Sequence, residues 1–267
     1  MVDQGISSVL TAYYSHSRLI HRIDSNDDGT PERWMAIDHT SWVWDPTEDG
    51  NADRHRDNLR AVVTRDTNSD GNIDVVRALQ QNTAEFDNDS NGVVELQWTW
   101  RAGVRKVDTD HDGDLDYTAR MRGWHQHWDW GMVEYHIHRF ALTRMVDDDA
   151  DGHLEWKHRT IHMSNATDWD FDRHLEQRES YTATLVWWDA NEDGYEEHVF
   201  RRVKETNYLN QHANGWTEQN EETRSTEVWR NSVNQPQVRR ITVSYTHLRA
   251  HETREDRGCR GRGGKKK

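Results

Sequence analysis

Residues 66–86 read DTNSDGNIDVVRALQQNTAEF, and this 21-residue unit recurs along most of the chain. The unit opens with Asp, Asn and Asp at alternate positions, followed by Gly, and a further Asp comes three residues after the glycine. Elsewhere the segments between such loops alternate apolar and polar residues, as in Leu96, Trp98 and Trp100. Alternation with aromatic and β-branched residues is typical of half-buried β-strands. The sequence therefore predicts an all-β tandem-repeat protein.

The opening aspartate sets the register of the repeat. It recurs every 21 residues, at Asp24, Asp45, Asp66, Asp87 and Asp108, and again at Asp147, Asp168 and Asp189. One shortened unit of 18 residues, with the degenerate loop DWGMVE at 129–134, separates the two series. We expect each unit to hold one loop, a strand, a short turn such as QQNT (80–83) and a second strand. Two strands per unit would place all the acidic loops along one side of the sheet, at the same end of the strands.

The loop composition matches the chemistry of calcium. Calcium takes six to eight oxygen ligands, and Asp or Asn at positions 1, 3 and 5 of a tight loop can point oxygens toward one centre. Glycine suits the sharp turn at position 6. Plain acidic turns would also explain Asp, Asn and Gly. They do not explain a carboxylate at position 9, where a strand begins and Asp is disfavoured.

We therefore predict several bound calcium ions as the cofactor. The predicted ligands are Asp24, Asn26, Asp28, Glu32, Asp45, Asp49, Asp53, Asp66, Asn68, Asp70, Asp74, Asp87, Asp89, Asn91, Glu95, Asp108, Asp110, Asp112, Asp116, Asp147, Asp149, Asp151, Glu155, Asp168, Asp170, Asp172, Glu176, Asp189, Asn191, Asp193 and Glu197.

The segments DTNSDGNIDVV (66–76), DTDHDGDLDYT (108–118) and DDDADGHLEWK (147–157) resemble the calcium loop of bacterial FG-GAP/VCBS-type repeats. The resemblance implies calcium sites on an all-β repeat. An EF-hand is excluded because position 12 holds residues such as Arg77 and Ala119 in place of its bidentate Glu. The fold we expect is a series of antiparallel β-hairpin repeats of about 21 residues joined by calcium-binding loops. The alternative is a β-propeller of about five 42-residue blades, because stronger and weaker loops alternate.

The C-terminal segment differs from the rest. Residues 243–253 read VSYTHLRAHET and resemble a translated sequencing adaptor. We expect 1–242 to be a single calcium-loop domain truncated at its C-terminus, and 243–267 to be a non-native tail. The tail holds the only cysteine, Cys259, together with eight Lys/Arg and three Asp/Glu, so the net charge of −14 becomes −19 without it. Such a surplus disfavours nucleic acid and anionic membranes as partners.

We expect a non-enzymatic structural or adhesive module that is extracellular or on the cell surface, with calcium, glycans or other surface proteins as partners and without membrane insertion. One alternative is a calcium-dependent, lectin-like carbohydrate-binding domain that uses the tryptophans. A second is a calcium-stabilised hydrolase or lyase domain. His125, His127, His136 and His138 form two H-x-H pairs around the degenerate loop. On adjacent strands they can bind zinc or copper or serve as ordinary strand residues.

Overall fold

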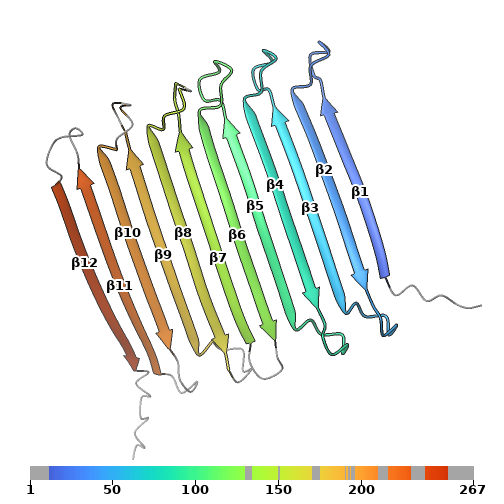
Figure 1. Ribbon diagram of the computed structural model, residues 1–267, viewed down its shortest axis with the longest axis vertical. Coiled ribbons are helices and arrows are strands. Elements are labelled where there is room, and N and C mark those ends of the chain that lie inside the picture. The colour runs from blue at the N-terminus through green and yellow to red at the C-terminus, as the bar shows by residue number, and fades with distance from the viewer. Residues whose placement is uncertain are drawn as a thin grey trace, which may run out of the picture.

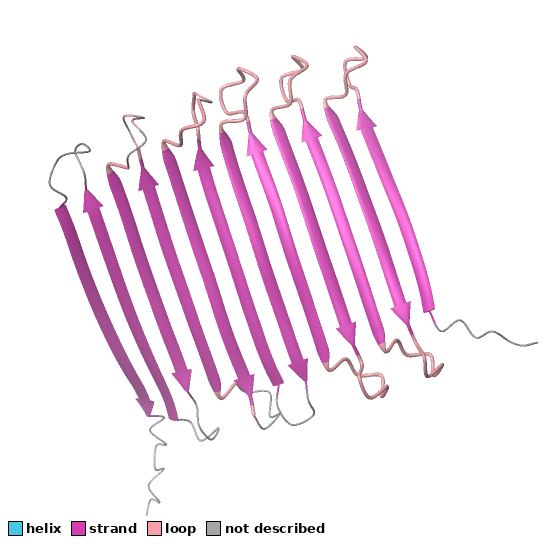
Figure 2. Ribbon diagram, in the orientation of Figure 1, coloured by secondary structure: helices cyan, strands magenta, loops and turns pink. Residues whose placement is uncertain are grey.

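The computed structural model describes residues 12–129, 134–149, 151–169, 175–189, 191, 193, 196–209, 216–229 and 238–251. These residues form strands and loops, and Figure 2 draws no helix among them. Within this part of the chain, no helix has the length and apolar character needed to span a membrane. The predicted all-β class is confirmed.

Twelve strands form one antiparallel sheet in which each strand pairs with its neighbours in sequence. The strands are β1 (Ala12–Ile23), β2 (Arg33–Trp44), β3 (Arg54–Arg65), β4 (Val75–Phe86), β5 (Leu96–Val107), β6 (Tyr117–Asp129), β7 (Glu134–Val146), β8 (Trp156–Asp168), β9 (Gln177–Trp188), β10 (His198–Leu209), β11 (Trp216–Trp229) and β12 (Val238–His251). Figure 1 shows them side by side, with β1 and β12 at opposite sides of an open sheet. Tandem hairpins are therefore confirmed, and the propeller alternative is wrong.

The prediction of two strands per unit is wrong. Each 21-residue unit holds one loop of nine residues and one strand of 12, and the expected turn at 80–83 lies in the middle of β4. Successive loops therefore lie at opposite ends of the strands, not all at one end (Figure 1). One reason is local, because tight hairpin turns favour residues with positive φ such as Asn-Gly and QQNT contains no glycine. The other is pairing with β3 and β5, which keeps this segment extended.

The register divides the side chains between two faces, because directly opposed residues lie on the same side of a sheet. Trp100 lies opposite Trp124, and we call the face that they share the tryptophan face. His127 lies opposite His136 on the other side, which we call the histidine face. Both faces bear apolar and polar residues, since no second layer covers either one within the described residues.

Most of the buried side chains are acidic and lie in the loops at the ends of the strands, not in an apolar core. Among the described residues, the buried apolar residues are three alanines, Ala36, Ala84 and Ala183. Nine loop carboxylates are buried, namely Asp53, Asp66, Asp74, Asp87, Asp108, Asp116, Asp168, Glu176 and Asp189. Burial of carboxylates is costly unless the charges are neutralised or hydrogen-bonded. The stability of this sheet therefore depends on how the loops accommodate these charges.

The last strand includes part of the adaptor-like segment. Strand β12 pairs with β11 along its whole length, from Val238 opposite Trp229 to His251 opposite Trp216. Residues 243–251 thus continue the sheet, although the sequence led us to leave them out of the fold. Their apolar and polar residues alternate (VSYTHLRAH), which suits a strand added to an open sheet edge. The non-native origin of 243–267 stays a prediction.

Candidate metal centres

The first aspartate of each loop fixes the path of the backbone. In the loop at 66–74, Asp66 accepts hydrogen bonds from the N–H of Ser69 at 2.6 Å and of Gly71 at 2.8 Å. Asp108 accepts the equivalent bonds from His111 at 2.6 Å and Gly113 at 2.9 Å. Asp66 and Asp108 thus each use both carboxylate oxygens to close their loop.

Positions 4 and 6 adopt left-handed backbone angles. Gly71 has a φ of 91°, and Ser69, two residues earlier, has a φ of 59°. Glycine carries little penalty there, whereas a residue with a side chain at such a φ is strained. Five loops repeat this strained position 4, at Asp27, Glu48, Ser69, Ser90 and His111. Strain that recurs in unit after unit is characteristic of a loop whose shape is constrained by function.

Positions 3 and 5 each use one oxygen to hold the backbone. Asn68 accepts a hydrogen bond from the N–H of Asp70 at 3.1 Å, and Asp70 accepts one from Asn72 at 2.7 Å. The hydrogen bond from the Asn72 backbone is the main reason why the pKa of Asp70 is lowered. Position 5 therefore stays ionised while its second oxygen faces the side-chain amide of Asn68 at 2.9 Å.

The position-9 carboxylate closes the loop from the opposite end. One of its oxygens accepts the N–H of position 2, as from Ser25 to Glu32 at 2.6 Å and from Asp148 to Glu155 at 2.7 Å. The other oxygen is buried without a hydrogen-bond donor in three loops, at Glu32 Oε1, Asp53 Oδ1 and Glu155 Oε1. Buried polar atoms are rarely left without a partner. These oxygens are therefore suited to a ligand that supplies positive charge.

The carboxylates converge in four of the predicted loops. Their oxygens lie within 4.8 Å of one another in the groups Asp87–Asp89–Glu95, Asp108–Asp110–Asp116, Asp147–Asp149–Asp151–Glu155 and Asp189–Asp193–Glu197. In the same loops, the side-chain amide of Asn91 donates a hydrogen bond to Asp89, and the side-chain oxygen of Asn191 accepts the N–H of Asp193. Asp112 at position 5 accepts the N–H of Asp114. The structure thus brings together most of the ligands predicted in these loops.

Repulsion within such a group is visible at Asp110. The hydrogen bond from the Asp112 backbone favours the ionised form of Asp110. Desolvation and the nearby carboxylates, including those of Asp116 and Asp108, outweigh that bond and raise the pKa of Asp110. A cation at the centre of the loop would reverse this effect, because an opposite charge favours ionisation.

The loops at 24, 45 and 66 differ in detail. In the described structure their carboxylates alone do not meet the same limit. The amide nitrogen of Asn26 instead faces Asp28 at 2.9 Å, and Thr47 occupies position 3 between Asp45 and Asp49. Here the predicted ligands Asp24, Asp28, Glu32, Asp45, Asp49, Asp53, Asp66, Asp70 and Asp74, with the amides of Asn26 and Asn68, lie in the loops as expected but form a looser set.

Neighbouring loops at the same end of the strands are linked to each other. His111 Nδ1 lies 3.0 Å from Asp74 Oδ1, and Asp108 donates its N–H to the Asp74 carbonyl at 2.8 Å. Burial alone would raise the pKa of Asp74, but hydrogen bonds from Thr67 and His111 outweigh it and lower this pKa to about 2. Asp74 therefore remains ionised although it is only 1% exposed.

The loop at 168–176 is described at its two ends. Asp168 and Glu176 are both buried, and the N–H of Trp169 reaches Glu176 Oε2 at 2.5 Å. The two ends therefore have the arrangement of the other loops. The predicted ligands Asp170 and Asp172 lie outside the described residues.

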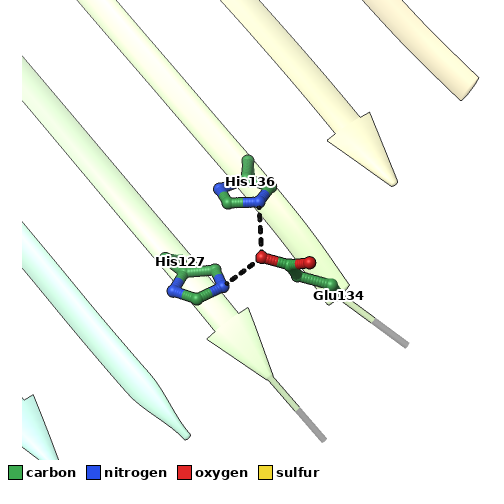
Figure 3. A group of neighbouring side chains, drawn as sticks. All are labelled: His127, Glu134 and His136. Atoms are coloured by element: carbon green, nitrogen blue, oxygen red, sulfur yellow. Dashed lines mark hydrogen bonds and ion pairs between the residues drawn. The ribbon is translucent and has the colours of Figure 1, made fainter. Parts of the chain in front are cut away.

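The two H-x-H pairs share the histidine face, as the sequence indicates. His127 lies directly opposite His136, and His125 lies opposite His138. Burial, together with repulsion from His136 and His138, lowers the pKa of His125. The sequence reasoning overlooked Glu134, which contacts two of these imidazoles (Figure 3). A signal was present, because Glu134 follows the degenerate loop at the start of a strand, close to the place that the position-9 acids take.

No protein-family model matches this chain, and neither a curated protein nor a solved structure is detectably similar to it. The functional argument therefore rests on the geometry of the loops and faces. The likeness of the loops to FG-GAP/VCBS-type repeats stays a prediction.

Proposed function

We propose that this chain is a calcium-binding structural or adhesive repeat module of an extracellular or cell-surface protein. The acidic loops at both ends of the strands would each hold a calcium ion through oxygens at positions 1, 3, 5 and 9, with backbone carbonyls completing the coordination shell. Bound ions would neutralise the buried carboxylates, and the sheet would then present two broad faces on a rigid frame.

The observation that carries this proposal is the set of buried oxygens without a donor. Glu32, Asp53 and Glu155 lie in three different loops, yet each leaves one buried carboxylate oxygen without a hydrogen-bond donor. In Glu32 and Glu155 the other oxygen accepts a backbone N–H. An acidic turn that existed only to reverse the chain would gain nothing from this arrangement, since each such atom costs about 1–3 kcal/mol. A calcium ion would satisfy it.

Calcium titration, measured by calorimetry, tests the proposal. We expect several ions per chain with dissociation constants of about 10⁻⁴–10⁻³ M, because these loops lack the bidentate position-12 Glu of tight sites. Glu155→Gln should remove one ion, since it keeps the shape of the side chain but halves its oxygen donors. Magnesium, which demands octahedral geometry and retains its waters, serves as the control ion. Equal binding of the two ions, or no saturable binding, would contradict the proposal.

The tryptophan face favours acidic polysaccharide as the ligand of an adhesive module. On the described residues of strands β3 to β8, this face bears nine cationic side chains and no carboxylate. The cations are Arg54, Arg56, Arg60, Lys106, Arg120, Arg122, Arg139, Lys157 and Arg159. Such a face is unexpected on a chain with a net charge of −14.

Aromatic rings lie among these cations. The Arg54 guanidinium lies 4.8 Å from the centre of the Trp44 ring, and that of Arg139 lies 5.6 Å from the Trp124 ring. A shallow hollow of about 510 Å³ includes Arg60, Arg120 and Arg122 around small residues of β4 and β5. Flat aromatic rings suit sugar rings, and guanidinium groups pair with carboxylates. A uronate-containing glycan satisfies both.

A matched pair of variants tests this second candidate. Arg120→Gln combined with Arg122→Gln removes two cations from the tryptophan face, whereas Arg101→Gln with Arg105→Gln removes two from the histidine face of the adjacent strand. In calcium-containing buffer, we expect the first variant to bind a polyuronate at least about fivefold more weakly, corresponding to about 1 kcal/mol, and the second to bind like the wild type. Equal losses in both variants, or equal binding of a neutral glycan, would contradict the assignment.

A further inference from the structure

The shortened unit changes the donor atoms that the repeat offers. Its sequence at 129–134 retains the opening Asp129 and an acid at the start of the next strand, Glu134, but has no acids between them. Where other units supply carboxylates from positions 3 and 5, this unit supplies imidazoles from the flanking strands. His127 comes from the end of β6, and His136 comes from the beginning of β7. Nitrogen donors shift metal preference from calcium toward zinc and similar ions.

The two imidazoles converge on one oxygen atom. Glu134 Oε1 lies 2.8 Å from His127 Nε2 and 2.9 Å from His136 Nε2 (Figure 3). The rings of His127 and His136 are stacked, with centroids 4.5 Å apart and planes 7° apart. Among the described groups whose donor atoms lie within 4.8 Å of one another, this one contains histidine and the others are purely acidic.

The surroundings add negative charge to this position. In the register of the sheet, Glu134 lies directly opposite Asp129 on β6 and directly opposite Asp168 on β8. Three carboxylates therefore occupy one row across neighbouring strands, and like charges placed opposite each other are destabilising. A divalent cation bound to Glu134 would reduce the repulsion along this row.

The site is also open to ions from solution. The side chains of His127, Glu134 and His136 are 25%, 29% and 35% exposed. Zinc bonds of about 2.0–2.2 Å place tetrahedral donor atoms about 3.3 Å apart. The donors would therefore separate by about half an ångström from their present contacts, which side-chain rotation can provide.

We propose that His127 Nε2, His136 Nε2 and Glu134 Oε1 form a zinc site, with water as the fourth ligand. The site belongs to the shortened unit alone and does not depend on the oxygen-only calcium loops. It would join β6 to β7 at the hairpin of the shortened unit.

Zinc titration of the full chain in calcium-saturated buffer tests this proposal, with calorimetry for stoichiometry and the histidine ring-proton NMR signals for location. We expect one zinc ion per chain and selective shifts of the His127 and His136 signals. Glu134→Gln and His127→Gln/His136→Gln should each weaken binding at least about tenfold, because each removes a ligand. Circular dichroism would show whether the variants remain folded.

His39→Gln/His55→Gln is the matched control. These two histidines also flank one carboxylate on the histidine face, but they contact different oxygens of Asp57, at 3.3 Å and 3.2 Å. Their nitrogens therefore do not meet at one point, and this variant should bind zinc like the wild type. Wild-type affinity in the folded His127→Gln/His136→Gln variant, or equal weakening in both double variants, would overturn the proposal. If calcium binding failed, the zinc result could still be interpreted, because zinc binding is measured from its own stoichiometry and from the histidine NMR signals.

Discussion

Removal of calcium should abolish the cooperative thermal unfolding of this chain. The described sheet has three buried apolar residues, all alanines, whereas nine loop carboxylates are buried. At 1 mM calcium and a dissociation constant of 10⁻⁴ M, each occupied loop adds about 1.4 kcal/mol to the free energy of unfolding. Seven or eight such loops would contribute about 10 kcal/mol, as much as the whole stability of a typical domain.

Circular dichroism melts with and without a calcium chelator measure this effect. Readdition of calcium should restore the transition, whereas an equal concentration of magnesium should restore little of it. The melting temperature should also rise with calcium concentration, because the ion binds the folded state. A melt that is unchanged by the chelator would show that hydrogen bonds alone stabilise the loops, and the calcium assignment would then fail.

The second large effect is expected from Asp108→Ala in the central loop. Asp108 is 2% exposed and accepts the N–H groups of His111 and Gly113, so the substitution removes a proposed metal ligand and two hydrogen bonds together. We expect the free energy of unfolding to fall by about 2–4 kcal/mol. The number of bound calcium ions should fall by one. Chemical denaturation and calcium titration measure the two quantities.

Asp114→Ala is the control for this variant. It removes the same charge from the same loop, but the Asp114 side chain is exposed and position 7 contributes to the loop through its backbone. Its effect should stay within about 0.5 kcal/mol, as for ordinary surface substitutions. If both variants lose the same stability, the loss reflects loop charge in general and not the position-1 role of Asp108.

The loops could be predicted from the sequence because their geometry is local. Position 1 accepts hydrogen bonds from positions 4 and 6, and position 9 accepts one from position 2, as between Thr109 and Asp116 at 2.7 Å, so none spans more than seven residues. The spacing of Asp, Gly and the position-9 acid therefore contains most of the information. The backbone role of position 4 was not predicted, since residues as different as Ser69 and His111 occupy it with the same left-handed φ.

The arrangement of the strands was harder to predict because it depends on pairing. Gln80, Gln81 and Asn82 are polar and interrupt the alternation, so they suggest a turn when β4 is considered alone. In the sheet, Gln81 lies opposite Leu59 and Arg101, and Asn58 donates a hydrogen bond to Asn82. Contacts with residues about 20 positions away thus keep this segment extended. The histidine pairs were recognised from the sequence, but Glu134 was not, because its contacts with His127 and His136 depend on the pairing of β6 with β7.

The order of the strands has a mechanical consequence. Because every strand contacts only its sequence neighbours and β1 and β12 lie at opposite sides, tension applied through the termini would act across the strands. Hydrogen bonds would then open one after another and not all at once. Each released unit of 21 residues would add about 70 Å of slack, so the protein would lengthen in steps under load, which single-molecule pulling can record. Calcium in the loops would set the force at which each step occurs.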